Sequence, residues 1–470
     1  MNIINDFPSI LVLLPIIFSI VGILVNKEKF SLYSLVTLHF ILAVFLFFAY
    51  IKIGISKEIR YFFGGWKAPY GIEFVVNKPN LVFLSLLFFT SFSTTLFSFK
   101  DLNFFIGDSC KVKFISIFMI CLSGFAGMIL TNDIFNLYVF LEISSISAYT
   151  LASIGGRKSI KPAIDYLIVG TFAATIFLLG IGFIYLVTGT LNITDISGVV
   201  INQNYKNLYF VGIGLMTIGL FIKFAIFPFH RWMISIYENS NFFITIFFSA
   251  ISTKVMLFVL FKLKNQIFKI DSVSAHSVDD IFLSFSALAI IGMGITAVLQ
   301  DKLRSILSYS SASQIGYMLM AITISTKTNY KLFMSYMLIH SLAKMGLFMQ
   351  TSIIDKNRDS GASLILFISF VVAGAAIIGI PGTGGFIVKL NLILEFLKLN
   401  NWVVSGIIIL GSVMSIYYFW PPFEQLYAAN LQKSKNTILL NINQKIVLII
   451  VSIIIILLGI FPNIFQIVLD

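Results

Sequence analysis

The chain has very little charge for its length. Only 11% of its 470 residues are Asp, Glu, Lys or Arg, whereas 58% are hydrophobic and the mean hydropathy is +0.98. A water-soluble domain does not need so much apolar sequence. Apolar runs of about 17–25 residues, the length of a membrane-spanning helix, recur from end to end. This composition argues against a soluble protein and predicts a polytopic membrane protein.

Cysteine is almost absent, and so are the motifs of soluble enzymes. The two cysteines, Cys110 and Cys121, belong to no CxxC motif and no His/Cys cluster. This argues against a disulfide framework, structural zinc and iron–sulfur sites. HExxH and GxxxxGK[ST] motifs are also absent, so we expect no metal, no cofactor and no soluble-type catalysis. The net charge of +12 comes from residues scattered over short loops, which is typical of lipid-facing loops rather than of nucleic-acid binding.

Fourteen apolar runs predict membrane spans. They are helices rather than barrel strands, because backbone groups in lipid must be hydrogen-bonded within the segment. The predicted spans are 8–25, 31–53, 80–98, 114–131, 134–153, 162–187, 208–228, 241–261, 280–300, 303–324, 330–353, 362–380, 400–420 and 445–466. The segment 60–78, with Gly-Gly, Ala-Pro and Tyr-Gly in a β-rich run, predicts an extracytoplasmic hairpin. The first span starts without a basic region or cleavage site, so we expect a retained helix.

The distribution of Lys and Arg weakly indicates the orientation of the chain in the membrane. With the N-terminus outside, sixteen basic residues fall in cytoplasmic loops and twelve in outer loops, among them Lys262 and Lys264. The bias has the direction expected for positive charge on the cytoplasmic side. We therefore expect a multi-pass protein of the bacterial cell (inner) membrane.

Two of the predicted spans are interrupted by proline. Lys223 is followed by Pro228, and Pro381 opens Pro-Gly-Thr-Gly-Gly before Lys389. Proline frees a backbone carbonyl, and clustered glycines let a helix unwind. A broken helix in each half is typical of inverted repeats with an ion site at the membrane midplane, although ordinary kinks are the alternative.

The predicted fold class is therefore an all-α polytopic membrane protein of about fourteen transmembrane helices, with two inverted five-helix repeats. The predicted regions are 1–113 (N-terminal helices and hairpin), 114–261 (first repeat), 280–420 (second repeat) and 421–470 (C-terminal helix).

Five ionisable side chains fall inside these apolar runs: Glu142, Lys223, Lys254, Lys344 and Lys389. A charge at the bilayer centre costs about 2.5–3.5 kcal/mol even on insertion scales, so such residues usually serve ion movement. Buried lysines in general release a proton readily. One alternative is that the lysine side chains extend to the lipid headgroups. For Lys389, which lies just beyond a predicted break, a position at the membrane–water interface is a further alternative.

Glu142 is the only acid that we place deep within a span. Tyr138, Ser145 and Tyr149 share its helical face, so this polar stripe should face protein or water. Its natural partner is a buried lysine, because mutual attraction keeps both groups charged. A purely structural ion pair is the alternative.

Histidine and hydroxyl groups extend the polar set. His340 precedes Lys344 by one helical turn, which suggests a proton relay, although a packing role is as plausible. The span 303–324 is rich in hydroxyls that either join helices or order water.

Other polar residues have supporting roles in this interpretation. We expect His230, with Pro228 and Pro381, to support or gate the two breaks. Asp133 lies at the start of a predicted helix, where a negative charge interacts favourably with the helix dipole. Capping of the helix is the simpler interpretation, and a place at an ion entrance is the alternative.

Several long motifs, in order, resemble one family. They are NDIFNLYVFLEISSISAY, GLFIKFAIFPFHRW, SAISTKV, QDKLRSILSYSSASQIGYM, IHSLAKMGLF and GIPGTGGFIVK. Together they resemble the antiporter-like subunits shared by Mrp-type multisubunit Na⁺/H⁺ antiporters and the membrane arm of respiratory complex I. The hairpin sequence YFFGGWKAPYGIEFVV is most similar to that of the Mrp D subunit.

The resemblance implies a row of protonatable groups that moves protons in a cation (Na⁺)/proton antiporter complex. Glu142 and Lys223 would form a switchable ion pair, and Lys254 would pass a proton to His340 and Lys344. Lys389 would then exchange it with one side. The implied partners are other membrane subunits, protons, monovalent cations and lipid. The alternative is a pumping subunit of an NADH–quinone oxidoreductase, in which case the chain would belong to a translocase.

Some stretches depart from the family pattern. The chain has Pro-Gly-Thr-Gly-Gly-Phe at 381–386 where the family usually has Pro-Pro-Leu-Ser-Gly-Phe. The acid often found after the hairpin is missing at Asn77–Lys78, the loop MISIYENSNF is unusual, and 354–362 is short. These changes motivate a further alternative, a scaffold subunit that no longer transports.

Overall fold

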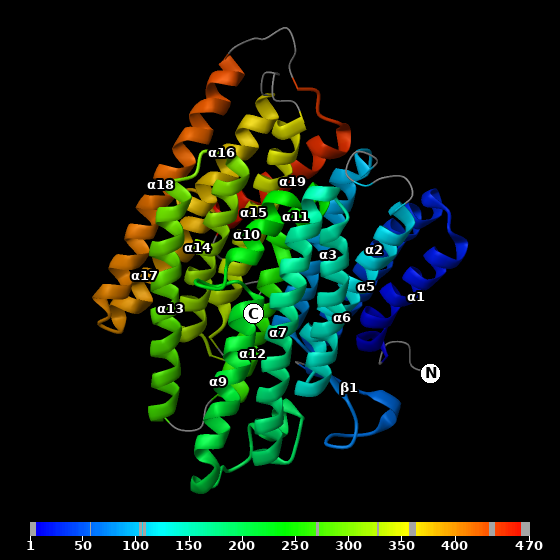
Figure 1. Cartoon of the computed structure of the whole chain (residues 1–470), viewed down its shortest axis with the longest axis vertical. Coiled ribbons are helices and arrows are strands. Elements are labelled where there is room, and N and C mark those ends of the chain that lie inside the picture. The colour runs from blue at the N-terminus through cyan, green and yellow to red at the C-terminus, as the bar shows by residue number, and fades with distance from the viewer. Residues whose placement is uncertain are drawn as a thin grey trace. The chain divides into compact units, whose positions relative to one another are not determined.

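The computed structural model describes residues 6–56, 58–102, 106, 110–268, 272–326, 329–356, 363–431 and 438–461. It confirms an all-α membrane protein, since twelve helices in these residues are long and apolar enough to cross a membrane (Figure 1). The chain forms two compact units, each described by itself below. The first comprises Met1–Phe92, Ile106–Phe224 and Val255–Val278, and the second comprises Ser93–Phe105, Ala225–Lys254 and Asp279–Asp470.

The first unit contains the N-terminal helices, the hairpin and the helices that carry Glu142 and Lys223. In it, α6 packs against both α5 and α7, and α7 packs against α9 (Figure 1). The elements are α1 Phe7–Val25, α2 Glu28–Ser56, β1 Glu58–Phe62, η1 Phe63–Gly65, β2 Glu73–Asn77, most of α3 Lys78–Ser98, α5 Lys111–Leu130, α6 Ile134–Ser153, α7 Arg157–Thr188, α8 Ile193–Ile196, η3 Gln203–Tyr205, α9 Lys206–Lys223 and most of α12 Thr253–Gln266.

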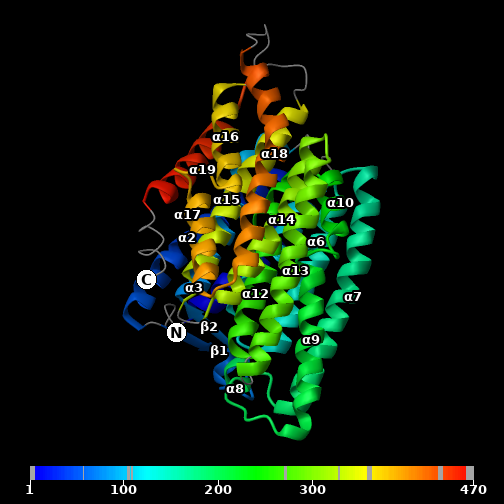
Figure 2. The ribbon, with the colours of Figure 1, turned by 90° about the vertical axis from the view of Figure 1, so that its left-hand side faces the viewer.

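The second unit contains the remaining lysines of the predicted row. Here α15 packs against α14, α16 and α17, and α16 packs against α18 and α19 (Figure 2). The elements are α10 Arg231–Asn239, α11 Phe242–Phe247, the π-helical turn η4 Phe248–Ser252, most of α13 Ser272–Val298, α14 Leu303–Ile324, α15 Lys331–Lys356, α16 Leu364–Ile378, α17 Gly384–Lys398, α18 Trp402–Leu431 and α19 Ile442–Ile460.

The predicted spans agree well with these helices, and both predicted breaks are present. α9 ends at Lys223 and α10 begins at Arg231, while α16 ends at Ile378 and α17 begins at Gly384. The predicted list contains no separate helix over 384–398. That segment forms α17, which begins after five intervening residues and, at fifteen residues, is shorter than an ordinary span.

The assignment of Lys262 and Lys264 to an outer loop is wrong. α12 extends to Gln266 and buries both side chains, which are 7% and 6% exposed. The Lys262 ammonium donates to the backbone carbonyls of Ile129, at 3.3 Å, and Thr131, at the end of α5. These carbonyls lie where a helix leaves its last C=O groups without intrahelical partners, so the lysine can be buried with its charge solvated.

The segment predicted as a hairpin is one. Strands β1 and β2 pair antiparallel, with Arg60 opposite Val75. The Glu73 carboxylate, whose side chain is 2% exposed, accepts hydrogen bonds from Arg60 at 2.9 Å, Asn132 at 2.8 Å and Asn192 at 2.9 Å. This buried carboxylate therefore joins the hairpin to the chain segments that precede α6 and α8.

We predict that Glu73→Ala lowers the stability of the protein by about 3–5 kcal/mol, because it leaves buried donors without an acceptor. The matched control is Glu58→Ala, which removes the other carboxylate on the same Arg60. That pair is about 40% exposed on both sides, so the control should cost less than about 1 kcal/mol. Thermal denaturation in detergent measures both, and equal effects would contradict a structural role specific to Glu73.

Candidate functional site

Lys223 is the last residue of α9 and is 4% exposed. Its ammonium donates to the Ser145 hydroxyl at 2.7 Å and the Tyr149 hydroxyl at 3.1 Å, and lies 5.6 Å from the centre of the Tyr149 ring. Ser145 and Tyr149 are one turn apart on α6, so a single face of that helix holds the charge.

Glu142 lies on the same face of α6, but it does not touch Lys223. One of its carboxylate oxygens, Oε1, is buried and has no hydrogen-bond partner among the described residues. The Glu142 charge still acts on the Lys223 ammonium electrostatically. The two groups expected to form an ion pair are therefore near each other in the first unit, with Ser145 and Tyr149 taking the place of the carboxylate.

Lys254 follows a π-helical turn that periodicity did not predict. The turn covers Phe248–Ser252, and Lys254 is 1% exposed two residues later. Its ammonium donates to the backbone carbonyl of Ser249, five residues earlier. Single π turns inside α-helices are rare and occur frequently at functional sites.

His340 and Lys344 are fully buried, one turn apart on α15. The Lys344 ammonium donates to the Leu307 carbonyl at 3.0 Å and to the Ser310 hydroxyl, both on α14. Neither ring nitrogen of His340 has a hydrogen-bond partner among the described residues. His340 and Lys344 are thus neighbours along one helix, as their spacing predicts, but no hydrogen bond joins them.

Lys389 lies in the second turn of α17 and is 5% exposed. Its ammonium donates to the carbonyls of Ile377 at 2.8 Å and Ile378 at 3.1 Å, and to the Ser412 hydroxyl at 3.2 Å. The two carbonyls belong to the C-terminal end of α16, where the helix dipole favours a cation. The ammonium also lies 4.7 Å from the centre of the Tyr317 ring.

Two cavities are lined in part by α17, and Lys389 lines the smaller of them. The smaller one has a volume of about 10 Å³, close to the space of one water molecule. Its lining includes Gln314, Tyr336, His340 and Lys389. Gln314, in the polar span 303–324, accepts a hydrogen bond from the Tyr336 hydroxyl at 2.7 Å, and its amide nitrogen has no partner in the described part of the chain.

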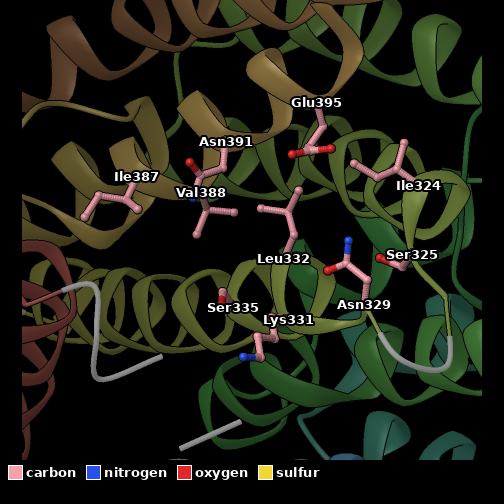
Figure 3. A pocket seen from close by; sticks show the side chains of 10 residues that line it. All are labelled: Ile324, Ser325, Asn329, Lys331, Leu332, Ser335, Ile387, Val388, Asn391 and Glu395. Atoms are coloured by element: carbon pink, nitrogen blue, oxygen red, sulfur yellow. The ribbon is translucent and has the colours of Figure 1, made fainter. Parts of the chain in front are cut away.

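The larger cavity has a volume of about 320 Å³ and is open to the surface. Its lining is mixed, with Asn391 and Glu395 of α17 on one side and Lys331 and Ser335 of α15 on the other (Figure 3). Val388 lines both cavities and is itself 2% exposed. A buried apolar side chain therefore separates a polar vestibule from the small cavity beside Lys389.

The supporting residues lie at the breaks and helix ends. His230 directly precedes α10, and its ring stacks on Phe227, with centroids 5.5 Å apart. Pro228 follows Phe227 through a cis peptide bond, and Pro381 lies exposed between α16 and α17.

Asp133 caps α6, as the simpler interpretation predicted. It accepts a hydrogen bond from the Asn136 N–H at 2.7 Å. Burial raises the pKa of this carboxyl above its usual value, and hydrogen bonds from the N–H groups of Asn136 and Phe135 act in the opposite direction.

Comparison with known proteins identifies the family of the chain. The sequence model of the transmembrane domain of the NADH:quinone oxidoreductase/Mrp antiporter family matches residues 131–415. The chain belongs to this family. It is 31% identical to the N subunit of NADH-quinone oxidoreductase from Desulforudis audaxviator, over 79% of this chain and 76% of that protein. It is 28% identical to the D subunit of the Na⁺/H⁺ antiporter from Alkalihalophilus pseudofirmus, over 76% and 75% of the two chains.

A solved structure extends the likeness over nearly the whole chain. A subunit of the membrane-bound sulfane sulfur reductase, an archaeal respiratory membrane complex, superimposes with a TM-score of 0.90 and 26% identity, covering 98% of this chain and 96% of that one. The protein is thus an antiporter-type membrane subunit, with relatives in both antiporter and respiratory complexes.

At Gly385, a position where this antiporter-type subunit keeps the glycine of the family pattern, α17 lies very close to α16. A Cβ atom added to Gly385 would lie 1.8 Å from the backbone oxygen of Ala376. Gly385 is one turn before Lys389, so this close approach lets Lys389 reach the carbonyls of Ile377 and Ile378. The glycine at 385, which matches the family pattern, therefore allows the contacts that hold the Lys389 ammonium.

We predict that Gly385→Ala destabilises the protein by about 1–3 kcal/mol, because α17 must move away from α16. Gly406→Ala is the control, since Gly406 lies in α18 with open space around it, and alanine favours a helix. The measurements are the melting temperature in detergent and the amount of protein in the membrane. Equal melting temperatures for the two variants would contradict the close packing of α16 and α17.

Proposed function

We propose that this chain is the proton-translocating subunit of a multisubunit monovalent cation (Na⁺)/proton antiporter. The observation that carries the proposal is a row of four buried lysines, Lys223, Lys254, Lys344 and Lys389, in the helices α9, α12, α15 and α17. None of their ammonium groups has a carboxylate within 4.0 Å among the described residues. Their hydrogen-bond partners are carbonyl and hydroxyl oxygens.

Neutral partners suit a group that must gain and lose a proton. A carboxylate at contact distance would stabilise the charged lysine strongly. Release of the lysine proton would then leave the carboxylate as an unpaired buried charge, which is costly. Carbonyl and hydroxyl oxygens solvate the ammonium without that penalty when it becomes neutral. The lysines are therefore held in a way that supports proton transfer more than a purely structural role.

In the first unit, Glu142 and Lys223 act as the switch. With Lys223 bound to Ser145 and Tyr149, the pair is open, and its closed form would bring the ammonium to the buried Glu142 oxygen. Closing the pair changes the field on neighbouring protonatable groups. This change is the physical link by which movement of one ion can bias movement of another.

In the second unit, protons pass among Lys254, His340, Lys344 and Lys389. His340 experiences the charges of all three lysines, so its protonation responds to theirs. The small cavity shared by His340 and Lys389 provides a place for a proton-carrying water. The larger cavity beyond Val388 gives Lys389 a route to one side of the membrane.

A second candidate is a proton-pumping subunit of a respiratory complex. The identity of 31% to an N subunit of NADH-quinone oxidoreductase and the likeness to the sulfane sulfur reductase complex favour it. In either case the partners are other membrane subunits. The same lysines would carry protons, driven by a redox reaction in place of a cation gradient.

The test is proton flux in everted vesicles that carry the whole operon, with wild type beside Glu142→Gln and Lys223→Ala. We expect flux that requires added sodium and falls by about tenfold or more in both variants, because each removes one member of the switch. Potassium in place of sodium tests the choice of cation.

The controls separate the candidates. Flux that appears only during NADH oxidation would place the chain in a respiratory complex. If the assembled complex shows no flux under either condition, the chain is a scaffold. Full flux in Lys223→Ala would contradict a proton-transfer role for the pair.

A further inference from the structure

Arg304 has a position that its own helix does not explain. It lies in the first turn of α14, within the QDKLRSILSYSS stretch. A cation at a helix N-terminus opposes the helix dipole. Its guanidinium must therefore be stabilised by other parts of the chain.

The end of α10 provides the first of these contacts. The Arg304 Nε donates to the Tyr237 carbonyl at 2.5 Å, and Nη2 donates to the Ser240 carbonyl at 2.5 Å. Both carbonyls lie in or just after the last turn of α10, which ends at Asn239. Carbonyls there have no partner within the helix and form the negative end of its dipole, so one fork-shaped cation caps this end.

The start of α11 provides the second set of contacts. Nη2 also donates to the Thr245 hydroxyl at 3.0 Å, and that hydroxyl donates to the Asn241 carbonyl at 3.1 Å. The guanidinium carbon lies 4.3 Å from the centre of the Phe242 ring. A single side chain therefore fixes the end of α10 and the first turn of α11 relative to each other.

The junction that Arg304 fixes leads directly to Lys254. α11 ends at Phe247 and continues without interruption into the π turn Phe248–Ser252. Thr245 precedes Ser249 by one helical turn, and the Ser249 carbonyl holds the Lys254 ammonium. A shift of α11 therefore moves the oxygen that receives the Lys254 charge.

We infer that Arg304 is a positioning residue for proton transfer at Lys254, acting through Thr245 and the α11 backbone. The inference rests on the proposed function, because it assumes that Lys254 carries protons. Lysine cannot replace Arg304, since a single ammonium lacks the planar fork that reaches two carbonyls and a hydroxyl together. The acids whose charges act on Arg304 are Asp355 and Glu238, and they are not part of the contact to α11.

The experiment compares Arg304→Lys, Thr245→Val and the double variant in the whole assembled complex, with proton flux measured as a function of pH. We expect Arg304→Lys to reduce flux by about tenfold to a hundredfold, because small displacements of reacting groups are costly. Thr245→Val should have a smaller effect. The double variant should resemble Arg304→Lys alone, because both substitutions interrupt the same path.

The pH dependence of the proton flux distinguishes a loss of positioning at Lys254 from a loss of folded complex. Besides Lys254 itself, the titratable groups close to this site in the second unit are His340 and Lys344 of α15. Loss of the Ser249 carbonyl contact disfavours protonated Lys254, so the pH of half-maximal flux should move to lower values in Arg304→Lys. A variant that only folds less well would show the wild-type profile with an amplitude scaled to the amount of complex.

Two further variants serve as controls for this interpretation. Lys302→Gln removes an exposed cation two residues away and should leave flux and pH profile unchanged. Lys254→Gln tests the underlying function. If Lys254→Gln abolishes flux while Arg304→Lys keeps the wild-type rate and profile, the positioning role is overturned. If Lys254→Gln keeps full flux, the proposed proton path is wrong at that residue, whatever Arg304 does.

Discussion

The structure depends on the solvation of ammonium groups inside a membrane-spanning protein. Each of the four lysines needs oxygen atoms to replace water, and the four obtain them in three ways. Lys389 uses the carbonyl end of α16, and Lys254 uses a carbonyl of a π turn. Lys344 and Lys223 use hydroxyls on neighbouring helices. The breaks, the π turn and the hydroxyl-rich α14 therefore follow from one requirement, that a buried cation be hydrogen-bonded.

The buried charges fall into two groups with different consequences. Glu73 and Lys111 have partners of opposite charge, Arg60 and Glu28, each at 2.9 Å. Such pairs fix the arrangement of the chain and lose stability when one partner is removed. The four lysines of the row instead rely on neutral oxygens, which permit a change of charge. Lys262 also relies on neutral oxygens, so such partners permit proton transfer at the four lysines of the row but do not by themselves single them out.

The sequence predicts the helices well because apolar length is a strong signal, and α14 even begins and ends where it was expected, at residues 303 and 324. It fails where backbone geometry depends on tertiary contacts. The helix α17 was not predicted because its fifteen residues are too few for an ordinary span. Lys262 looked like a loop residue because lysine usually marks a helix end, and only the carbonyls of Ile129 and Thr131 explain its burial.

The site shows the same limits. The residues of the row and the two breaks were identified from position alone, since ionisable groups are rare in apolar runs. Some partners were named too, although not as ligands of the lysines: helical spacing placed Ser145 and Tyr149 on the face of Glu142, and Ser310 lies in the hydroxyl-rich span 303–324. The contacts of Arg304 with α10 and of Gln314 with Tyr336 were not predicted, because each joins segments that are separate in the sequence.

The most direct test of the account is to remove one charge of the row and measure stability and flux in the same preparation. In Lys344→Met the apolar side chain keeps much of the length of lysine, and we expect an unchanged or higher melting temperature because a buried charge is removed, together with loss of proton flux. Arg60→Met, which leaves the buried Glu73 carboxylate without its charged partner, should instead lower the melting temperature. If Lys344→Met melts much lower than wild type while the complex that remains transports normally, the row is structural and the central claim is wrong.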